Sequence, residues 1–214
     1  MSLKRKLSNL DDKNCTPFFA GLDKMFERGE YTDLVLHCKD GKDIKAHKMV
    51  LCVQSGYFAN ACKPESFSES FNGELNIDFK SRYVEAMLRY CYTFDHQIND
   101  VTAADHPHFH ATLYVMADYY QIPSLKSIAK SEFEAVVKAS DPEFFNTLVY
   151  VYENTPPEDD GLRHIVARLC ALSMATLICQ ERFMDVMAIA EAKEDLSKVL
   201  EGAISIYDVR MPRL

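Results

Sequence analysis

The chain has 214 residues, 48% of them hydrophobic, and carries a formal net charge of −8. This length suits one large domain, or one domain with an appendage, and the apolar content excludes wholesale disorder. The acidic balance argues against nonspecific nucleic-acid binding, which draws its affinity from neutralising phosphates.

The first predicted helix follows a short tail and carries a heavy apolar stripe. Residues 1–16 are expected to form a flexible tail. The apolar residues after it recur at i, i+4, i+7 and i+8, as on one face of a helix: Phe18, Phe19, Leu22, Met25 and Phe26. Such a face packs either on its own domain or against a second copy of the chain.

A β-hairpin is predicted next. Residues 31–38 are rich in apolar and β-branched side chains. Residues 43–46 alternate polar and apolar, as in a return strand with one buried face. Between them, Asp40-Gly41 tolerates the positive φ angles of a tight turn.

From His47 the apolar period becomes helical, until Gly56 breaks the run and Ser55 is placed to cap a second helix. The apolar positions here are Val50, Leu51, Val53 and Phe58. A third strand is predicted over residues 75–79, and Ser81 is placed to cap the helix after it. The stripe of that helix is Val84, Met87, Leu88 and Cys91. A small sheet among helices indicates an α+β domain.

Beyond residue 139 the sequence is all-helical. Asp141-Pro142 is a typical helix start, and residues 155–161 form a linker. The apolar residues recur at helical spacing: Phe144, Phe145, Leu148, Val149 and Tyr152; Leu162, Ile165, Val166 and Leu169; Phe183, Val186, Met187 and Ala190; Leu196, Val199, Leu200 and Ile204. These amphipathic helices are expected to pack on the first domain or on one another.

Nothing in the sequence predicts export or membrane insertion. No apolar run approaches the ~20 residues that span a bilayer, and residues 1–14 lack the apolar core of a signal peptide. Seven cysteines, an odd number without a CxxC pair, are typical of a reduced intracellular compartment. The expected location is the cytoplasm, the nucleus or both.

Motifs of catalysis are missing from the sequence, which holds no GxSxG, HExxH, P-loop or dinucleotide-type glycine pattern. His106, His108 and His110 raise the question of zinc. Their alternation brings only His106 and His110 near each other, so solvated or core-edge histidines are favoured. We expect a non-enzyme with no cofactor, no metal and no small-molecule substrate.

Four short motifs stand in order along residues 17–138. They are Asp33-Leu34-Val35-Leu36; Ala46-His47-Lys48-Met49-Val50-Leu51 with Ser55-Gly56-Tyr57-Phe58; Leu88-Arg89-Tyr90-Cys91-Tyr92-Thr93; and Tyr114-Val115-Met116-Ala117-Asp118-Tyr119-Tyr120-Gln121-Ile122. In this order they resemble the BTB/POZ domain, a protein-interaction module. The resemblance implies a BTB/POZ fold over residues 17–138, with a small sheet flanked by a helical cluster. An all-helical extension over residues 139–214 makes the whole similar to short BTB proteins of filamentous fungi.

The resemblance also implies roles for individual residues. Asp33 and Lys48 match the charged-pocket pair of the family, although Asp33 in a purely structural role would cap backbone donors and pair with Lys48. The apolar helix at residues 18–26 is similar to the helix that many BTB dimers bury against its twin. A homodimer without strand exchange is therefore expected.

Phe67-Ser68-Glu69, followed by Ser70, is similar to the hydrophobic-x-Glu element of adaptors that bind the cullin-three scaffold of ubiquitin ligases. A large apolar anchor with a carboxylate beside it suits a partner pocket. The alternative is a solvated Glu69 and a Phe67 tucked under its loop. The expected function is homo-oligomerisation and partner recruitment, with a cullin-three substrate adaptor as one form. A self-associating scaffold or transcription-linked regulator with no cullin contact is the other.

Overall fold

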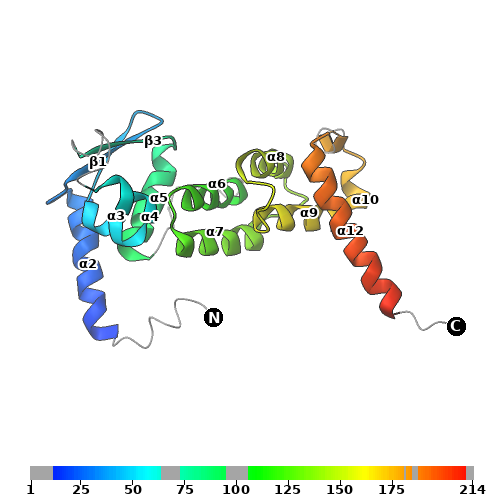
Figure 1. The fold of residues 1–214 in the computed structure, drawn as a ribbon, viewed down its shortest axis with the longest axis horizontal. Helices are drawn as coiled ribbons and strands as arrows, with labels where there is room; N and C mark the ends of the chain where they lie inside the picture. Colours follow the sequence, from blue (N-terminus) through cyan, green and yellow to red (C-terminus); the bar gives the residue numbers. More distant parts are fainter. Residues whose placement is uncertain (1–11, 64–72, 95–105, 181, 185–187, 211–214) are drawn as a thin grey trace. The chain divides into compact units, whose positions relative to one another are not determined.

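The computed structural model describes residues 12–63, 73–94, 106–180, 182–184 and 188–210 (Figure 1). Contacts along the backbone divide the chain into two compact units. The first holds residues 1–100 and 116–126, and the second holds residues 101–115 and 127–214.

The first unit is built on a three-stranded sheet with strand order β2-β1-β3. β1 (Leu34–Cys38) and β2 (Asp43–Ala46) pair antiparallel, and β3 (Glu74–Ile77) runs parallel to β1. Gly41 has φ +80°, a left-handed conformation that favours glycine in the turn. The predicted hairpin and third strand are confirmed.

Alternation along the strands gives the sheet one buried face, because successive side chains point to opposite sides. The buried members are Leu34, Leu36, Cys38, Ile44, Ala46, Leu75 and Ile77. Helix α5 (Ser81–Thr93) contacts β2 and is buried around most of its circumference. It forms the centre of the core of this unit.

Three further helices of the first unit pack around α5 or on one another. α2 (Asp12–Arg28) and α3 (Lys48–Gln54) both contact α5, and α4 (Gly56–Ala61) packs on α3. The Ser55 hydroxyl accepts a hydrogen bond from the Phe58 amide at 3.1 Å, so the predicted cap of α4 is confirmed. α2 begins at Asp12, which makes the last residues of the expected tail helical.

Two aspartates that flank β1 cap two different helices. Neither α3 nor α5 receives a side-chain hydrogen bond from its own capping residue. Instead, Asp33 accepts the Lys48 amide at 2.7 Å, one residue into the start of α3. Asp40 accepts the Ser81 hydroxyl at 2.8 Å and the Ser81 amide at 3.0 Å. The prediction that Ser81 itself caps α5 is therefore wrong, because Ser81 is the donor.

In the described part of the second unit, every element of regular secondary structure is a helix. α8 (Phe144–Asn154), α9 (Leu162–Leu172), α10 (Met174–Leu177) and α12 (Ala190–Arg210) belong to it, and α9 contacts the other three. α6 (His106–Tyr119) and α7 (Pro123–Val136) each contribute residues to both units. A BTB fold with a small sheet and helices after it is the architecture expected from the sequence.

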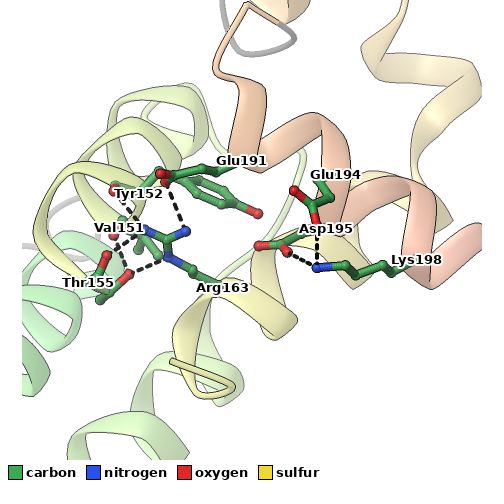
Figure 2. A network of polar contacts seen from close by, with 8 residues as sticks. All are labelled: Val151, Tyr152, Thr155, Arg163, Glu191, Glu194, Asp195 and Lys198. Atoms are coloured by element: carbon green, nitrogen blue, oxygen red, sulfur yellow. Dashed lines mark hydrogen bonds and ion pairs between the residues drawn. The ribbon is translucent and has the colours of Figure 1, made fainter. Parts of the chain in front are cut away.

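A buried arginine joins three helices of the second unit (Figure 2). The Arg163 side chain on α9 is 4% exposed and donates to the Tyr152 carbonyl at 3.1 Å, to the Thr155 hydroxyl at 3.0 Å and to the Thr155 carbonyl. It also pairs with Glu191 of α12 at 2.9 Å. Because α8 ends at Asn154, the last carbonyls of α8 have no donor within the helix. The Arg163 guanidinium supplies donors to them, and its positive charge complements the dipole of α8.

Among the helices that the structure describes, none combines the length and apolar character needed to cross a bilayer.

Candidate interaction surface

Large apolar side chains lie exposed on two helices of the first unit. We name this the α2–α3 surface. Its members are Phe18 and Met25 on α2, Tyr31 just after α2, and Met49 and Val53 on α3, with exposed fractions between 39% and 83%. Exposed apolar residues are common singly, whereas contiguous apolar patches are typical of interaction sites.

A hollow of about 370 Å³ lies within this surface. Its walls are mostly apolar, with one carboxylate and one imidazole among them, and are formed by Leu22, Met25, Tyr31, Asp33, His47, Met49 and Val50. Apolar walls with a few polar groups suit a partner's side chain, because the apolar area supplies affinity and the polar groups fix orientation.

Tyr31, a member of this surface, has a strained backbone conformation. Its φ is +59° and its side chain is 83% exposed. A non-glycine residue in the left-handed region costs roughly 1–2 kcal/mol. Strain of this kind concentrates at functional sites, and here it directs an aromatic ring outward beside the hollow.

Helix α2 divides its predicted dimer residues between two faces. Phe26 stacks on Tyr92 of α5 at 4.5 Å between ring centroids, and Phe19 meets Phe94 edge-on at 5.3 Å. Leu22 lines the hollow. Phe18 is 61% exposed and Met25 39% exposed. The inward aromatic residues therefore anchor α2 on its own domain, while Phe18 and Met25 remain available to a partner.

The apolar residues at helical spacing from His47 onward do not all face the core. Val50 and Leu51 on α3 and Phe58 on α4 are buried, whereas Val53 on α3 is 79% exposed. Met49 lies four residues before Val53, and residues at this spacing share one helical face. The signal was present in the sequence, since Met49 and Val53 form their own pair beside the core pair Val50 and Leu51.

Asp33 and Lys48, the predicted charged-pocket pair, meet through the backbone. The Asp33 carboxylate accepts the Lys48 amide, while the Lys48 ammonium extends toward Gly73. A Cβ on Gly73 would lie 3.8 Å from that ammonium and 3.0 Å from the Asp33 carbonyl oxygen, and Gly73 has φ +72°. Glycine therefore permits the close passage of the chain entering β3.

His47 is held by three hydrogen bonds at the edge of the core. Its backbone amide donates to the Tyr92 hydroxyl at 2.9 Å, and its Nδ1 lies 2.6 Å from that same oxygen. Nε2 lies 2.8 Å from the Glu30 carbonyl. All three contacts are satisfied when Tyr92 donates to Nδ1 and the Nε2 proton is donated to Glu30. Burial of the Tyr92 ring raises the pKa of its hydroxyl to about 12, so that donor persists at neutral pH.

A cross-strand ionic cluster lies on the exposed side of the sheet. Nδ1 of His37 on β1 is 2.7 Å from Asp43 on β2, and Nε2 is 3.6 Å from Glu74 on β3. The hydrogen bond that the His37 imidazole donates to Asp43 is the largest cause that raises the pKa of His37 above its ordinary value of 6.5. Protonated His37 thus links all three strands.

We expect the Asp43→Asn variant to lower the pKa of His37 toward 6.5, and Glu74→Gln to lower it less, because the Glu74 contact is longer. Since the folded-state pKa is raised, the stability that His37 contributes is fully present below its unfolded pKa and is lost as pH rises through the folded pKa. NMR titration of the imidazole protons measures both shifts. Equal shifts in the two variants would contradict the assignment of Asp43 as the main partner.

The remaining predicted site residues fall into two groups. Phe67, Glu69 and Ser70 lie outside the described residues. His106 and His110 approach each other, with ring centroids 6.1 Å apart, whereas His108 packs against Tyr150 at 4.6 Å. Across the described ranges there is no group of three or more His, Cys, Asp or Glu side chains arranged to hold a metal ion.

Comparison with known proteins identifies relatives of residues 22–135. A profile of the family described as BTB/POZ domain matches residues 22–135, just over half of the chain. Among solved structures, the BTB domain of zebrafish PATZ1 aligns with a TM-score of 0.45 and 21% identity, over 58% of this chain and 94% of that one.

Three curated relatives are similar at the sequence level. Kelch repeat and BTB domain-containing protein 8 of Xenopus tropicalis is 26% identical over 120 residues, 56% of this chain and 18% of that protein. Inhibitor of Bruton tyrosine kinase of Xenopus laevis is 23% identical over 179 residues, covering 84% and 13%. A BTB/POZ domain-containing protein of Arabidopsis thaliana is 25% identical over 134 residues, covering 60% and 63%. The chain spans less than two thirds of the length of each relative.

Proposed function

The chain belongs to the BTB/POZ domain family, and from that membership we propose that it forms homodimers and recruits other proteins. BTB/POZ domains are protein-interaction modules that also mediate dimerisation. The observation that carries the proposal is the exposed α2–α3 surface. Its role is binding rather than catalysis.

The composition of the α2–α3 surface supports a second copy of the chain as one partner. Aromatic residues and methionine are enriched in protein interfaces, and four of its five members are of these types: Phe18, Met25, Tyr31 and Met49. Phe19 and Phe26 already fix α2 on its own domain, so little helix ordering is left for the moment of association. A two-fold dimer can use the same patch on both copies.

We expect the double variant Phe18→Glu with Met25→Glu to convert the dimer into a monomer, because association would bury unpaired carboxylates. Light scattering coupled to size-exclusion chromatography is expected to show a mass near that of two chains for the natural protein and one chain for the variant. Lys24→Glu, an exposed charge change on the same helix, is the matched control and should leave the dimer intact. A variant that stays dimeric with unchanged circular dichroism would exclude α2 from the interface.

A finer proposal is that the chain serves as a substrate adaptor for a cullin-three ubiquitin ligase. Its support is the resemblance of Phe67, Glu69 and Ser70 to the hydrophobic-x-Glu element of such adaptors. The alternative is a self-associating scaffold or transcription-linked regulator without cullin contact. Both use the same dimer, so only the cullin contact separates them.

The double variant Phe67→Ala with Glu69→Ala is expected to abolish a complex with the N-terminal part of a cullin-three scaffold. An apolar anchor and a charged contact at the centre of an interface each cost about 2 kcal/mol or more when truncated, so the joint loss exceeds a hundredfold in affinity. Light scattering of the mixture measures the complex, and the dimer mass of the variant alone is the control. If the natural dimer does not bind the cullin, the scaffold alternative replaces the adaptor proposal.

A further inference from the structure

Helix α2 carries a glycine for which its own chain gives no reason. Gly21 lies in the interior of α2, where glycine is the least favourable residue apart from proline. A Cβ on Gly21 would meet no atom within 4 Å in the part of the chain that the structure describes, so packing within the chain does not require glycine. A glycine at such a position lets another backbone approach the helix closely.

Gly21 lies on the exposed apolar side of α2. Phe18 is three residues before it and Met25 four residues after it, and residues at these spacings share one side of a helix. Phe18 and Met25 are therefore symmetric about the midpoint between Gly21 and Leu22, each about 5 Å from it along the helix axis. A two-fold axis through this midpoint would cross two antiparallel copies of α2 at Gly21 and set Phe18 of each copy beside Met25 of the other.

The hollow in the α2–α3 surface lies where such a crossing would bring an aromatic ring. Leu22 and Met25 form part of its wall, and Met49 of α3 forms another part. Its volume of about 370 Å³ exceeds what one ring needs, because a cavity of about 150 Å³ already holds benzene. Phe18 of the same chain does not line the hollow, since Phe18 lies about 10 Å before Met25 along the helix.

We propose that two copies of the chain cross at Gly21 and that Phe18 of each copy fills the hollow of the other. This inference rests on the homodimer proposed above and names the contact that forms it. Among the described side chains of α2, Phe18 is the most exposed large apolar one, and an aromatic ring contributes most to an interface when it is buried in a pocket. A two-fold contact occurs twice, so both hollows are filled together. Other partner proteins then bind the dimer elsewhere.

Substitution at Gly21 tests the crossing. We expect Gly21→Leu to raise the dissociation constant of the dimer at least tenfold in sedimentation equilibrium, because the added side chain holds the two helices apart. Within a single chain the added Cβ meets nothing, so the far-UV circular dichroism should be unchanged. Ala20→Leu is the matched control, since Ala20 is exposed and lies about 160° around the helix from Phe18. It should leave the dissociation constant unchanged.

A double-mutant cycle tests the filling of the hollow. Phe18→Ala and Met49→Ala are each expected to weaken the dimer, because Phe18 of one copy contacts Met49 of the other. The fold-change of the double variant should be at least threefold smaller than the product of the two single fold-changes, since both substitutions remove the same contact. Tyr119 is exposed on α6, outside the α2–α3 surface, so Phe18→Ala with Tyr119→Ala is the comparison in which the fold-changes multiply.

The outcomes separate this contact from the dimer itself. If Gly21→Leu dimerises as tightly as the natural chain, or if the losses of Phe18→Ala and Met49→Ala simply multiply, the inference is overturned while the homodimer stands. If the natural chain stays monomeric at every concentration, both the inference and the proposed homodimer are overturned. A weakened Gly21→Leu dimer together with coupling between Phe18 and Met49 supports the crossing and the filled hollow.

Discussion

Replacing Arg163 by methionine is expected to lower the free energy of unfolding by about 3–5 kcal/mol, because each buried acceptor that loses its donor costs about 1–3 kcal/mol. The guanidinium is the donor for the Tyr152 and Thr155 carbonyls and for the Thr155 hydroxyl, all at the end of α8 (Figure 2). Methionine fills a similar volume but leaves these acceptors without a donor in a buried place. The loss arises from unpaired carbonyls more than from Glu191, which is half-exposed and can be solvated.

Urea unfolding followed by far-UV circular dichroism measures this loss. Arg168→Met is the matched control, because Arg168 lies on the same helix, is 46% exposed and pairs with Glu134 at 2.6 Å. An exposed ion pair contributes less than about 1 kcal/mol. Arg163→Lys should fall between the two, because lysine keeps the charge but not the planar fork of donors. Similar losses in Arg163→Met and Arg168→Met would refute a specific role for the buried network.

The second large effect is expected at Gly161, just before α9. A Cβ there would lie 2.0 Å from the Tyr114 hydroxyl and 2.8 Å from an Asp159 carboxylate oxygen. That carboxylate accepts the Tyr114 hydroxyl at 2.7 Å and the Gly161 amide at 2.9 Å. Gly161→Ala therefore forces apart a buried tyrosine and the cap of α9, with an expected loss of about 2–4 kcal/mol.

Two comparisons isolate the steric cause. In the double variant Gly161→Ala with Tyr114→Phe, the clashing hydroxyl is gone, so the pair should be more stable than Gly161→Ala alone in the same urea experiment. Gly21→Ala, inside α2 and with no atom within 4 Å of the added Cβ, should instead raise stability by about 0.5–1 kcal/mol. A double variant no better than Gly161→Ala would show that the Tyr114 hydroxyl is not the main cause, since the ring carbon that carries it also lies 2.8 Å from the added Cβ.

The local part of the fold could be predicted from the sequence. Asp40-Gly41 predicted the hairpin, Ser55-Gly56 predicted the break between α3 and α4, and period-two alternation predicted β3. Each signal depends on neighbouring residues, so no knowledge of distant contacts was needed. The stripe on α2 was likewise visible, because Phe18, Leu22 and Met25 recur at helical spacing.

Contacts between residues that are far apart in the sequence could not be predicted from it. Arg163 follows Leu162 in an amphipathic helix, where a charged side chain suggests exposure to solvent, yet Arg163 is buried. Its partners are eight, eleven and twenty-eight residues away, and no local pattern joins them. The same holds for Val53, whose exposure follows from how α3 packs. The prediction of a cap from Ser81 failed because Asp40, forty-one residues earlier, supplies the acceptor.

Asp33 and Asp40, at the two ends of β1, couple local unfolding of that strand to unwinding of the first turns of α3 and α5. Asp33 receives the amide proton of Lys48 and Asp40 that of Ser81, so neither proton is shielded by its own helix alone. In native-state hydrogen exchange, these two amides should share the protection of the β1 ladder and exchange in one cooperative event. A strand that caps its neighbours in this way couples the order of folding to long-range pairing, because the first turns of α3 and α5 gain their caps only when β1 is in register with β2 and β3.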